Sequence, residues 1–361
     1  MNATPLKEIH SISGAEFGEY SGWTMPANYG NAAEENRAVR ARAGITDLSH
    51  RGKLRISGRD RVKFLQGMLS NDVENLEVWR CVYCTMLTVK GRMITDMKVL
   101  KEADSFLIDL EPGMNAKIKE LLEKYRLSYK ADIDDVTQEL ALISINGPGS
   151  RRIVEKAFGE QSGELVENGF VETRLDDITV TVARTSRTGE LGFDLYVPAG
   201  NAPEVWESVF GIGKERGLAP VGLEVIEVLR VEAGIPLYGV DMTENTIPIE
   251  AGLDRAISYE KGCYVGQEVV ARIHYRGHVN WHLVGFEVDG DGLPPAGTKL
   301  VHGEKEIGRI TSAAYSPALE GVIALGYIRR ELREPGTVVR LSEGSGDRAA
   351  KVVKTPFVAN R

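Results

Sequence analysis

The sequence has few cysteines and no long apolar run, and both absences exclude protein classes. Only 3 cysteines occur in 361 residues, which is too few for a disulfide-stapled secreted scaffold. No stretch of about 18 apolar residues is present, so we expect no membrane-spanning helix. The opening MNATPLKEIH also has no apolar core of a signal peptide. We therefore expect a reduced, cytoplasmic protein.

An excess of positive charge is also missing. The formal net charge is −8, so the chain lacks the global basic field that would drive nucleic-acid binding. The apolar share of 42% and the charged share of 27% are typical of globular proteins. A chain of 361 residues is longer than a single hydrophobic core usually supports. We therefore expect two or three lobes.

Helical and strand periodicities alternate over the first 280 residues, and the helical signal then disappears. A two-residue period between Cys84 and Leu110 predicts three strands. From Trp281 onward, only short strand patterns separated by turn residues remain, which predicts a separate all-β unit. The predicted helices are 31–44, 57–73, 115–126, 202–216, 223–234 and 265–272.

Asp96 is the first candidate for chemistry. In MITDMKV, strand alternation places Ile94, Asp96 and Lys98 on one face. A carboxylate in the middle of a strand could lie in a pocket, where it would accept hydrogen bonds from an amine-rich ligand or act as a base. The alternative is an ordinary solvated strand face, which Lys98 supports.

Two further patterns suggest metal or redox chemistry but do not fit it. Cys81 and Cys84 have the spacing of redox and zinc motifs. Zinc needs about four ligands, and a redox pair should open a helix rather than lead into a strand. We therefore interpret both as buried thiols. His274, His278 and His282 are four residues apart, but a glycine interrupts the helix that would align them, so no metal site is predicted.

The segment KGCYVGQE, from Lys261 to Glu268, crowds reactive groups around the third cysteine. Cys263 precedes a predicted helix, whose N-terminal dipole favours thiolate, and Lys261 adds a nearby positive charge. A buried cysteine in a surface loop is the equally open alternative.

Motifs along almost the whole chain resemble the tetrahydrofolate-binding glycine-cleavage T-protein superfamily. They are SGWTMPANYG, AVRARAGITDLSHRGKLRISGRD, FLQGMLSNDV, GRMITDMKV, INGP, RTGELGFDLYV, LRVEAGIPLYGVDMTENTIPIEAGL and GRITSAAYSP. The resemblance implies an α+β fold, a three-lobed ring with folate in the central hole and a small C-terminal β-barrel. We expect residues 1–52 with 138–240 in the first α+β lobe, 53–137 with 241–280 in the second, and 281–361 in the barrel.

KGCYVGQE is similar to the signature of the YgfZ-type branch, whose members bind folate and support iron–sulfur cluster assembly or repair. The main hypothesis is therefore a tetrahydrofolate-binding protein with that role, in which Cys263 is the functional residue. Such clusters commonly take four thiolates, so a cluster would be shared with a client or assembly protein.

The resemblance also carries over site residues. Asp96 matches the catalytic carboxylate of the superfamily's enzymes, and Tyr83 matches a folate-contacting tyrosine. Asp194 stands where the enzymes have a glutamate that holds the pterin. Arg187 stands where they have a tyrosine, and Ile226 where they have an arginine; both departures count against ordinary aminomethyl transfer. Arg187 could place a cation against the folate tail.

Lys261 and Tyr264, which flank Cys263, complete the predicted folate contacts, and no metal ligand is expected. The ligand would be tetrahydrofolate or a one-carbon derivative. The intact Asp96 and the opening SGWTMPANYG support an alternative, a tetrahydrofolate-dependent aminomethyltransferase or demethylase that uses Asp96, with a lipoyl carrier protein as partner. A folate sensor without chemistry at Cys263 is the third hypothesis. None of the three involves nucleic acid or a membrane.

Overall fold

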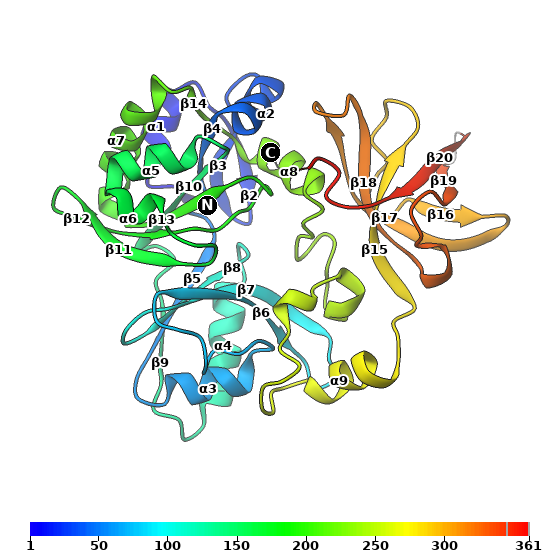
Figure 1. The fold of residues 1–361 in the computed structure, drawn as a ribbon, viewed down its shortest axis with the longest axis horizontal. Helices are drawn as coiled ribbons and strands as arrows, with labels where there is room; N and C mark the ends of the chain where they lie inside the picture. Colours follow the sequence, from blue (N-terminus) through cyan, green and yellow to red (C-terminus); the bar gives the residue numbers. More distant parts are fainter. Residues whose placement is uncertain (344–345, 360–361) are drawn as a thin grey trace.

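Three lobes surround a common centre in the computed structural model, which describes residues 1–343 and 346–359 (Figure 1). Within these residues, no helix combines the length and the apolar character needed to cross a bilayer. The expected α+β fold with a C-terminal β-barrel is confirmed. The residue boundaries proposed above for the three lobes stay a prediction.

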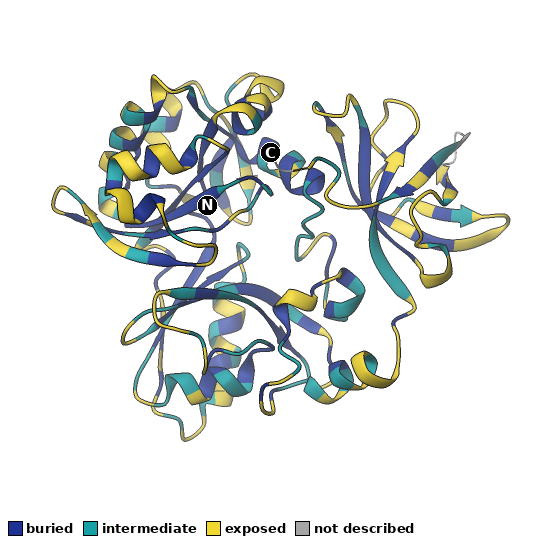
Figure 2. Ribbon diagram, in the orientation of Figure 1, coloured by how far each residue is buried: buried dark blue, intermediate teal, exposed yellow. Residues whose placement is uncertain are grey.

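The first lobe contains a six-stranded sheet in the order β11-β12-β13-β10-β4-β14 and a three-stranded sheet in the order β1-β3-β2. Its strands are β1 (Asn2–Ala3), β2 (Glu16–Tyr20), β3 (Trp23–Asn28), β4 (Ala43–Asp47), β10 (Leu140–Asn146), β11 (Phe170–Leu175), β12 (Ile178–Ala183), β13 (Gly192–Pro198) and β14 (Leu218–Pro220). Its helices are α1 (Lys7–Ile12), α2 (Ala32–Ala41), α5 (Ser150–Phe158), α6 (Glu160–Gly163), η1 (Ala199–Asn201), α7 (Ala202–Lys214) and α8 (Leu223–Glu232). The outer faces of α5 to α7 are exposed, whereas the strands behind them are largely buried (Figure 2).

The second lobe is inserted between β4 and β10 and has a five-stranded sheet in the order β6-β7-β8-β5-β9. Its strands are β5 (Gly52–Ser57), β6 (Arg80–Leu87), β7 (Met93–Lys101), β8 (Phe106–Leu110) and β9 (Asp132–Asp135). The helices α3 (Arg61–Met68) and α4 (Asn115–Arg126) lie in the same stretch of chain, and η2 (Pro248–Ala251), η3 (Asp254–Ala256) and α9 (Gln267–Arg276) return to it later. The predicted helix at 115–126 agrees with α4, and those at 202–216 and 223–234 agree with α7 and α8 to within two residues.

The third lobe is a closed barrel in the order β15-β18-β17-β16-β19-β20. Its elements are β15 (Trp281–Val288), β16 (Lys299–His302), β17 (Lys305–Ser316), β18 (Gly321–Arg329), η4 (Arg330–Leu332), β19 (Val338–Glu343) and β20 (Gly346–Val353). The all-β unit predicted from Trp281 is therefore confirmed.

Alternation along the strands gives the large sheet of the first lobe one apolar face and one polar face. Ile145 and Phe193, which are paired across β10 and β13, enter the core that the helices cover. Ser144 and Asp194, the neighbouring pair, point to the opposite side. The apolar face holds the lobe together, and the polar face supplies side chains for a site.

Helix α8 joins the lobes through buried charges. Glu232 accepts hydrogen bonds from Arg40 of α2 and from the hydroxyl of Ser316 in β17, at 2.5 Å in the second case. Arg230 donates to Asp241 at 2.5 Å and to Ser312 of β17 at 2.6 Å. These contacts fix the first lobe against the barrel.

We predict that Glu232→Ala destabilises the protein by about 3–5 kcal/mol, because it leaves the partly buried Arg40 and the buried Ser316 without a shared acceptor. Urea unfolding followed by circular dichroism measures this loss. Glu123→Ala on the exposed face of α4 is the matched control and should change stability by less than about 0.5 kcal/mol. Equal effects of the two substitutions would contradict the role given to Glu232.

Candidate active site

Strand register gathers charged side chains on one face of the second lobe's sheet. Tyr83 of β6 lies opposite Lys98 of β7, and Lys98 lies opposite Asp109 of β8. Asp96 is two residues from Lys98, so it faces the same side. The apolar residues between these positions enter the lobe's core on the other side. The predicted common face of Asp96 and Lys98 therefore exists, and it is a polar face with little exposure to solvent.

Asp96 has the most unusual environment on this face. It is 7% exposed, and the Tyr83 hydroxyl donates to its Oδ2 at 2.6 Å. Its Oδ1 is buried and has no hydrogen-bond partner among the described residues. Burial, followed by the negative charge of Glu111, raises the pKa of Asp96 to about 7, although the Tyr83 hydrogen bond and Arg51 oppose the shift. A buried acceptor without a partner favours the pocket alternative over the solvated strand face.

Asp194 of β13 lies fully buried against the same face. Its carboxylate accepts hydrogen bonds from Ser144 and Thr185, each at 2.7 Å, and from Arg187 Nε at 3.1 Å. Lys98 Nζ lies 3.4 Å from Asp194 Oδ2. Although burial opposes it, the cations of Arg187 and Lys98 hold the pKa of Asp194 below its ordinary value. The Asp194 carboxylate therefore pairs with two cations.

Asp109 continues this cluster across the boundary between the first two lobes. It accepts from Arg51 Nε at 2.6 Å, from the Tyr196 hydroxyl at 2.8 Å and from Arg187. Although burial opposes it, Arg187 and Arg51 hold the pKa of Asp109 well below its ordinary value. Arg51 also pairs with Glu111 at 2.8 Å. The Glu111 carboxylate therefore belongs to the same group of charged side chains.

The sequence did not reveal Asp109, Glu111 and Arg51 as part of the site. Alternation within each strand was readable, but the neighbour order β6-β7-β8-β5 was not. Asp194 and Arg187, predicted as folate contacts, are bound to each other. Their role toward folate stays a prediction, and the geometry gives both a structural function.

Lys261 and Tyr264 occupy positions that favour packing. Lys261 Nζ donates to the backbone carbonyls of Gln66 at 2.7 Å, Leu69 at 2.8 Å and Asn71 at 2.9 Å. These bonds use all three N–H groups of an ammonium and hold the end of α3. Burial lowers the pKa of Lys261 to about 8. The Tyr264 ring lies 5.1 Å from Lys261 Nζ and joins an apolar cluster. Folate contacts by these two residues stay predictions.

Cys263 is exposed, and its thiol makes no hydrogen bond with any residue of 1–343 or 346–359. The helix expected at 265–272 begins at Gln267, after Gly266 at its N-cap, so the thiol lies several residues before the helix rather than at its N-terminus. Among the described residues, the structure thus shows no hydrogen bond that connects Cys263 to the side chains around Asp96.

The other two cysteines are buried, as the sequence indicated. Cys81 and Cys84 belong to different core clusters, and burial raises their pKa values to about 11 and about 12. Residues three apart on a strand face opposite sides, so these thiols cannot form a redox pair.

The three histidines do not converge. His274 stacks on Tyr259 with ring centroids 3.7 Å apart, His278 follows the end of α9, and His282 lies in β15. Within the part of the chain that the structure describes, no group of three or more His, Cys, Asp or Glu side chains is placed to hold a metal ion.

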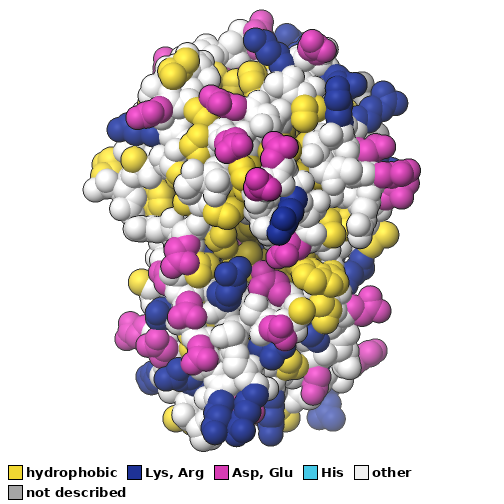
Figure 3. Space-filling model, turned by 90° about the vertical axis from the view of Figure 1, so that its left-hand side faces the viewer, with side chains coloured by type: hydrophobic (Ala, Val, Ile, Leu, Met, Phe, Trp, Pro, Cys, Tyr) yellow, Lys and Arg dark blue, Asp and Glu magenta, His cyan; other side chains and the backbone are white. Residues whose placement is uncertain are grey.

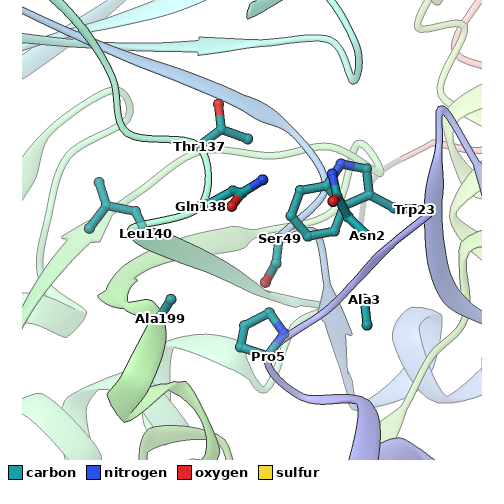
Figure 4. Close-up of a pocket in the computed structure, with 9 residues that line it drawn as sticks. All are labelled: Asn2, Ala3, Pro5, Trp23, Ser49, Thr137, Gln138, Leu140 and Ala199. Atoms are coloured by element: carbon teal, nitrogen blue, oxygen red, sulfur yellow. The ribbon is translucent and has the colours of Figure 1, made fainter.

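A cavity of about 190 Å³ lies elsewhere, at the two crossovers that link the first and second lobes (Figure 4). Trp23, Ser49, Thr137, Gln138 and Leu140 line it. It contains none of the side chains around Asp96. The outer face of these two lobes carries interspersed acidic and basic side chains (Figure 3). On the Asp96 face, by contrast, charged side chains from several strands meet. The Asp96 face is therefore the stronger candidate for chemistry.

Residues 6–261 match the family model described as the GCVT N-terminal domain, and residues 282–359 match the glycine cleavage T-protein C-terminal barrel domain. The chain belongs to the glycine cleavage T-protein family. This finding supports the superfamily part of the resemblance. It does not show the YgfZ-type branch.

Relatives of the T-protein family cover the chain almost completely. Proteins named aminomethyltransferase from Halothermothrix orenii and from Geobacillus sp. are each 32% identical to it, over 99% of this chain and 100% and 98% of theirs. The crystal structure of the glycine cleavage system aminomethyltransferase T from Bartonella henselae has a TM-score of 0.91, with 28% identity over 99% of this chain and 98% of that one. These names agree better with the aminomethyltransferase alternative than with iron–sulfur cluster assembly.

The burial of Asp96 predicts a stability effect with a defined pH dependence. Its folded pKa of about 7 lies above the ordinary 3.8, so the folded state loses stability relative to the unfolded state as pH rises from about 4 to about 7. Asp96→Asn should therefore raise the free energy of unfolding above pH 7, by about 4 kcal/mol at most, and the gain should vanish as pH falls toward 4. Chemical unfolding at several pH values measures it. The exposed Asp134→Asn is the control, and a gain that grows toward acid would contradict the assignment.

Exposure of one thiol among three gives a second test. The folded protein should react rapidly with one equivalent of 5,5′-dithiobis(2-nitrobenzoic acid) per chain, because only Cys263 is exposed and the buried thiols stay protonated. Unfolded protein should show three reactive thiols, and folded Cys263→Ser none. Rapid reaction of a second thiol in the folded state would disprove the placement of Cys81 or Cys84.

Proposed function

We propose that this protein transfers a one-carbon unit from an amine to tetrahydrofolate, as an aminomethyltransferase or demethylase that uses Asp96. The buried carboxylate of Asp96, with one oxygen free, carries the proposal. The aminomethyltransferase names of its relatives over nearly their full length support it.

The residues around Asp96 fit a ligand that carries N–H groups. Oδ1 is a buried acceptor without a partner, and such an atom is costly unless a donor reaches it. Tyr83 holds Oδ2, so the carboxylate has a fixed orientation with one oxygen available. Aminomethyltransferases of the T-protein family use tetrahydrofolate, which would supply the nitrogens that accept the one-carbon unit.

Asp96 is suited to hold and move a proton. With a pKa of about 7, both its acid and its base forms are populated at neutral pH, where general acid–base catalysis is most efficient. Burial and the negative charge of Glu111 raise this value, and the Tyr83 hydrogen bond and Arg51 oppose the rise. Correct positioning of two reactants can remove about 7–11 kcal/mol of a barrier, so one well-placed acid–base group is sufficient for an enzyme of this kind.

The one-carbon donor is the part of the proposal that family membership leaves most open. An aminomethyl group on a lipoyl carrier protein is the first donor to test, and methylated amines are the second. The ion pairing of Asp194 with Arg187 differs from the pattern expected of the superfamily's enzymes, which is the reason for testing both. No contact of Cys263 favours the iron–sulfur hypothesis, so we do not propose it.

Incubation with tetrahydrofolate and each donor should yield methylene- or methyl-tetrahydrofolate, detected by liquid chromatography. We predict that Asp96→Asn lowers the rate by about 10²–10⁴-fold, the usual contribution of a general acid–base group, while tetrahydrofolate still binds. Asp134→Asn should keep the full rate. Failure to form product from either donor, or an unchanged rate in Asp96→Asn, would refute the proposed function.

A further inference from the structure

We propose that Lys98 and Arg187 form a subsite that binds the carboxylate of a ligand held at Asp96. The inference deepens the proposed function, and it rests on that function for the amine placed at Asp96. It concerns N–H groups of Lys98 and Arg187 that do not bind Asp109 or Asp194.

Lys98 has spare donor capacity. Its Nζ has one hydrogen-bond acceptor among the described residues, Asp194 Oδ2 at 3.4 Å. An ammonium carries three N–H groups, so two remain for a ligand. The side chain is 15% exposed, which allows access. Lys98 follows Asp96 by two residues on the same face of β7, about 6–7 Å along the strand.

Arg187 presents a second cation beside Lys98. Its Nε and Nη2 bind Asp194 at 3.1 and 2.9 Å, and Nη2 also binds Asp109. Its Nη1 has no partner within residues 1–343 and 346–359. The side chain is 14% exposed. The two buried carboxylates hold the guanidinium rigidly, so its free edge is preorganised for an anion.

The carboxylates already present do not fill this subsite. Asp109 and Asp194 are fully buried, and each is shared among several donors. Glu111 is paired with Arg51. The groups left without partners are therefore N–H donors on cations, which a planar carboxylate satisfies by charge-assisted hydrogen bonds.

The positions of the negative and positive groups on this face indicate which class of ligand it can bind. Asp96 offers a negative acceptor for an amine, and Lys98 with Arg187 offers donors for a carboxylate a short distance away. A secondary or tertiary amine that bears a carboxylate near its nitrogen matches both ends. The carboxylate could belong to an N-methylated amino acid or to the glutamate tail of folate, which share this chemistry.

Calorimetric binding to the full chain separates these sources. N-methylglycine and N-methylethylamine differ only in that a methyl group replaces the carboxylate. Tetrahydrofolate and 6-methyltetrahydropterin differ by the whole p-aminobenzoylglutamate tail, so in this pair the carboxylate is read from the effect of Lys98→Gln. We predict that the carboxylate-bearing member of at least one pair binds about tenfold more tightly, and that Lys98→Gln lowers the affinity of that member without weakening the other member. The pair that responds identifies the source.

Lys98→Gln is preferred because it removes one long contact, whereas substitution of Arg187 would leave Asp109 and Asp194 buried without their main partner. Lys124→Gln, on the exposed side of α4, is the matched control and should leave all four affinities unchanged. If Lys98→Gln preserves the preference in both pairs, or if the wild type shows none, the subsite does not exist. Binding is measured without turnover, so absence of one-carbon transfer would refute the proposed function and leave this result intact.

Discussion

Two fully buried carboxylates between the first and second lobes require cations, and the arrangement of the site depends on that requirement. Asp109 belongs to the sheet of one lobe and Asp194 to the sheet of the other. Removing a carboxylate from water costs several kcal/mol unless a partner compensates. Arg187 reaches both of them, Arg51 reaches Asp109, and Lys98 approaches Asp194. The two lobes can therefore pack together only when these carboxylates are paired with the cations.

This pattern of ion pairs determines the environment of the Asp96 carboxylate. Arg51 is committed to Asp109 and Glu111, so it does not form an ion pair with Asp96 in the part of the chain that the structure describes. Tyr83 supplies a neutral donor instead. A carboxylate that is buried, lightly compensated and close to another negative charge keeps its proton to a higher pH. The cations stabilise Asp109 and Asp194 and leave Asp96 without an ion pair among the described residues.

The sequence predicted local structure well because local structure follows periodicity. The helix at 115–126, the all-β unit from Trp281 and the common face of Asp96 and Lys98 needed only the spacing of residues along the chain. Contacts between distant segments could not be predicted in this way. Lys261 carried a charge in a crowded motif, which suggested a ligand contact, yet its ammonium binds carbonyls about 190 residues earlier in the chain. Likewise, the pairing of Arg187 with Asp109 depends on how two sheets face each other, and no single strand reports it.

The insertion of the second lobe into the first has a consequence for synthesis on the ribosome. β4 emerges early, but its sheet neighbours β10 and β14 are both translated after the whole five-stranded sheet of the second lobe. The inserted five-stranded sheet can thus form while β4 still has two unpaired edges, although η2, η3 and α9 join this lobe later. An unpaired strand edge promotes association with other chains, so the nascent protein passes through a period of exposure to aggregation that ends only when β10 and β14 emerge.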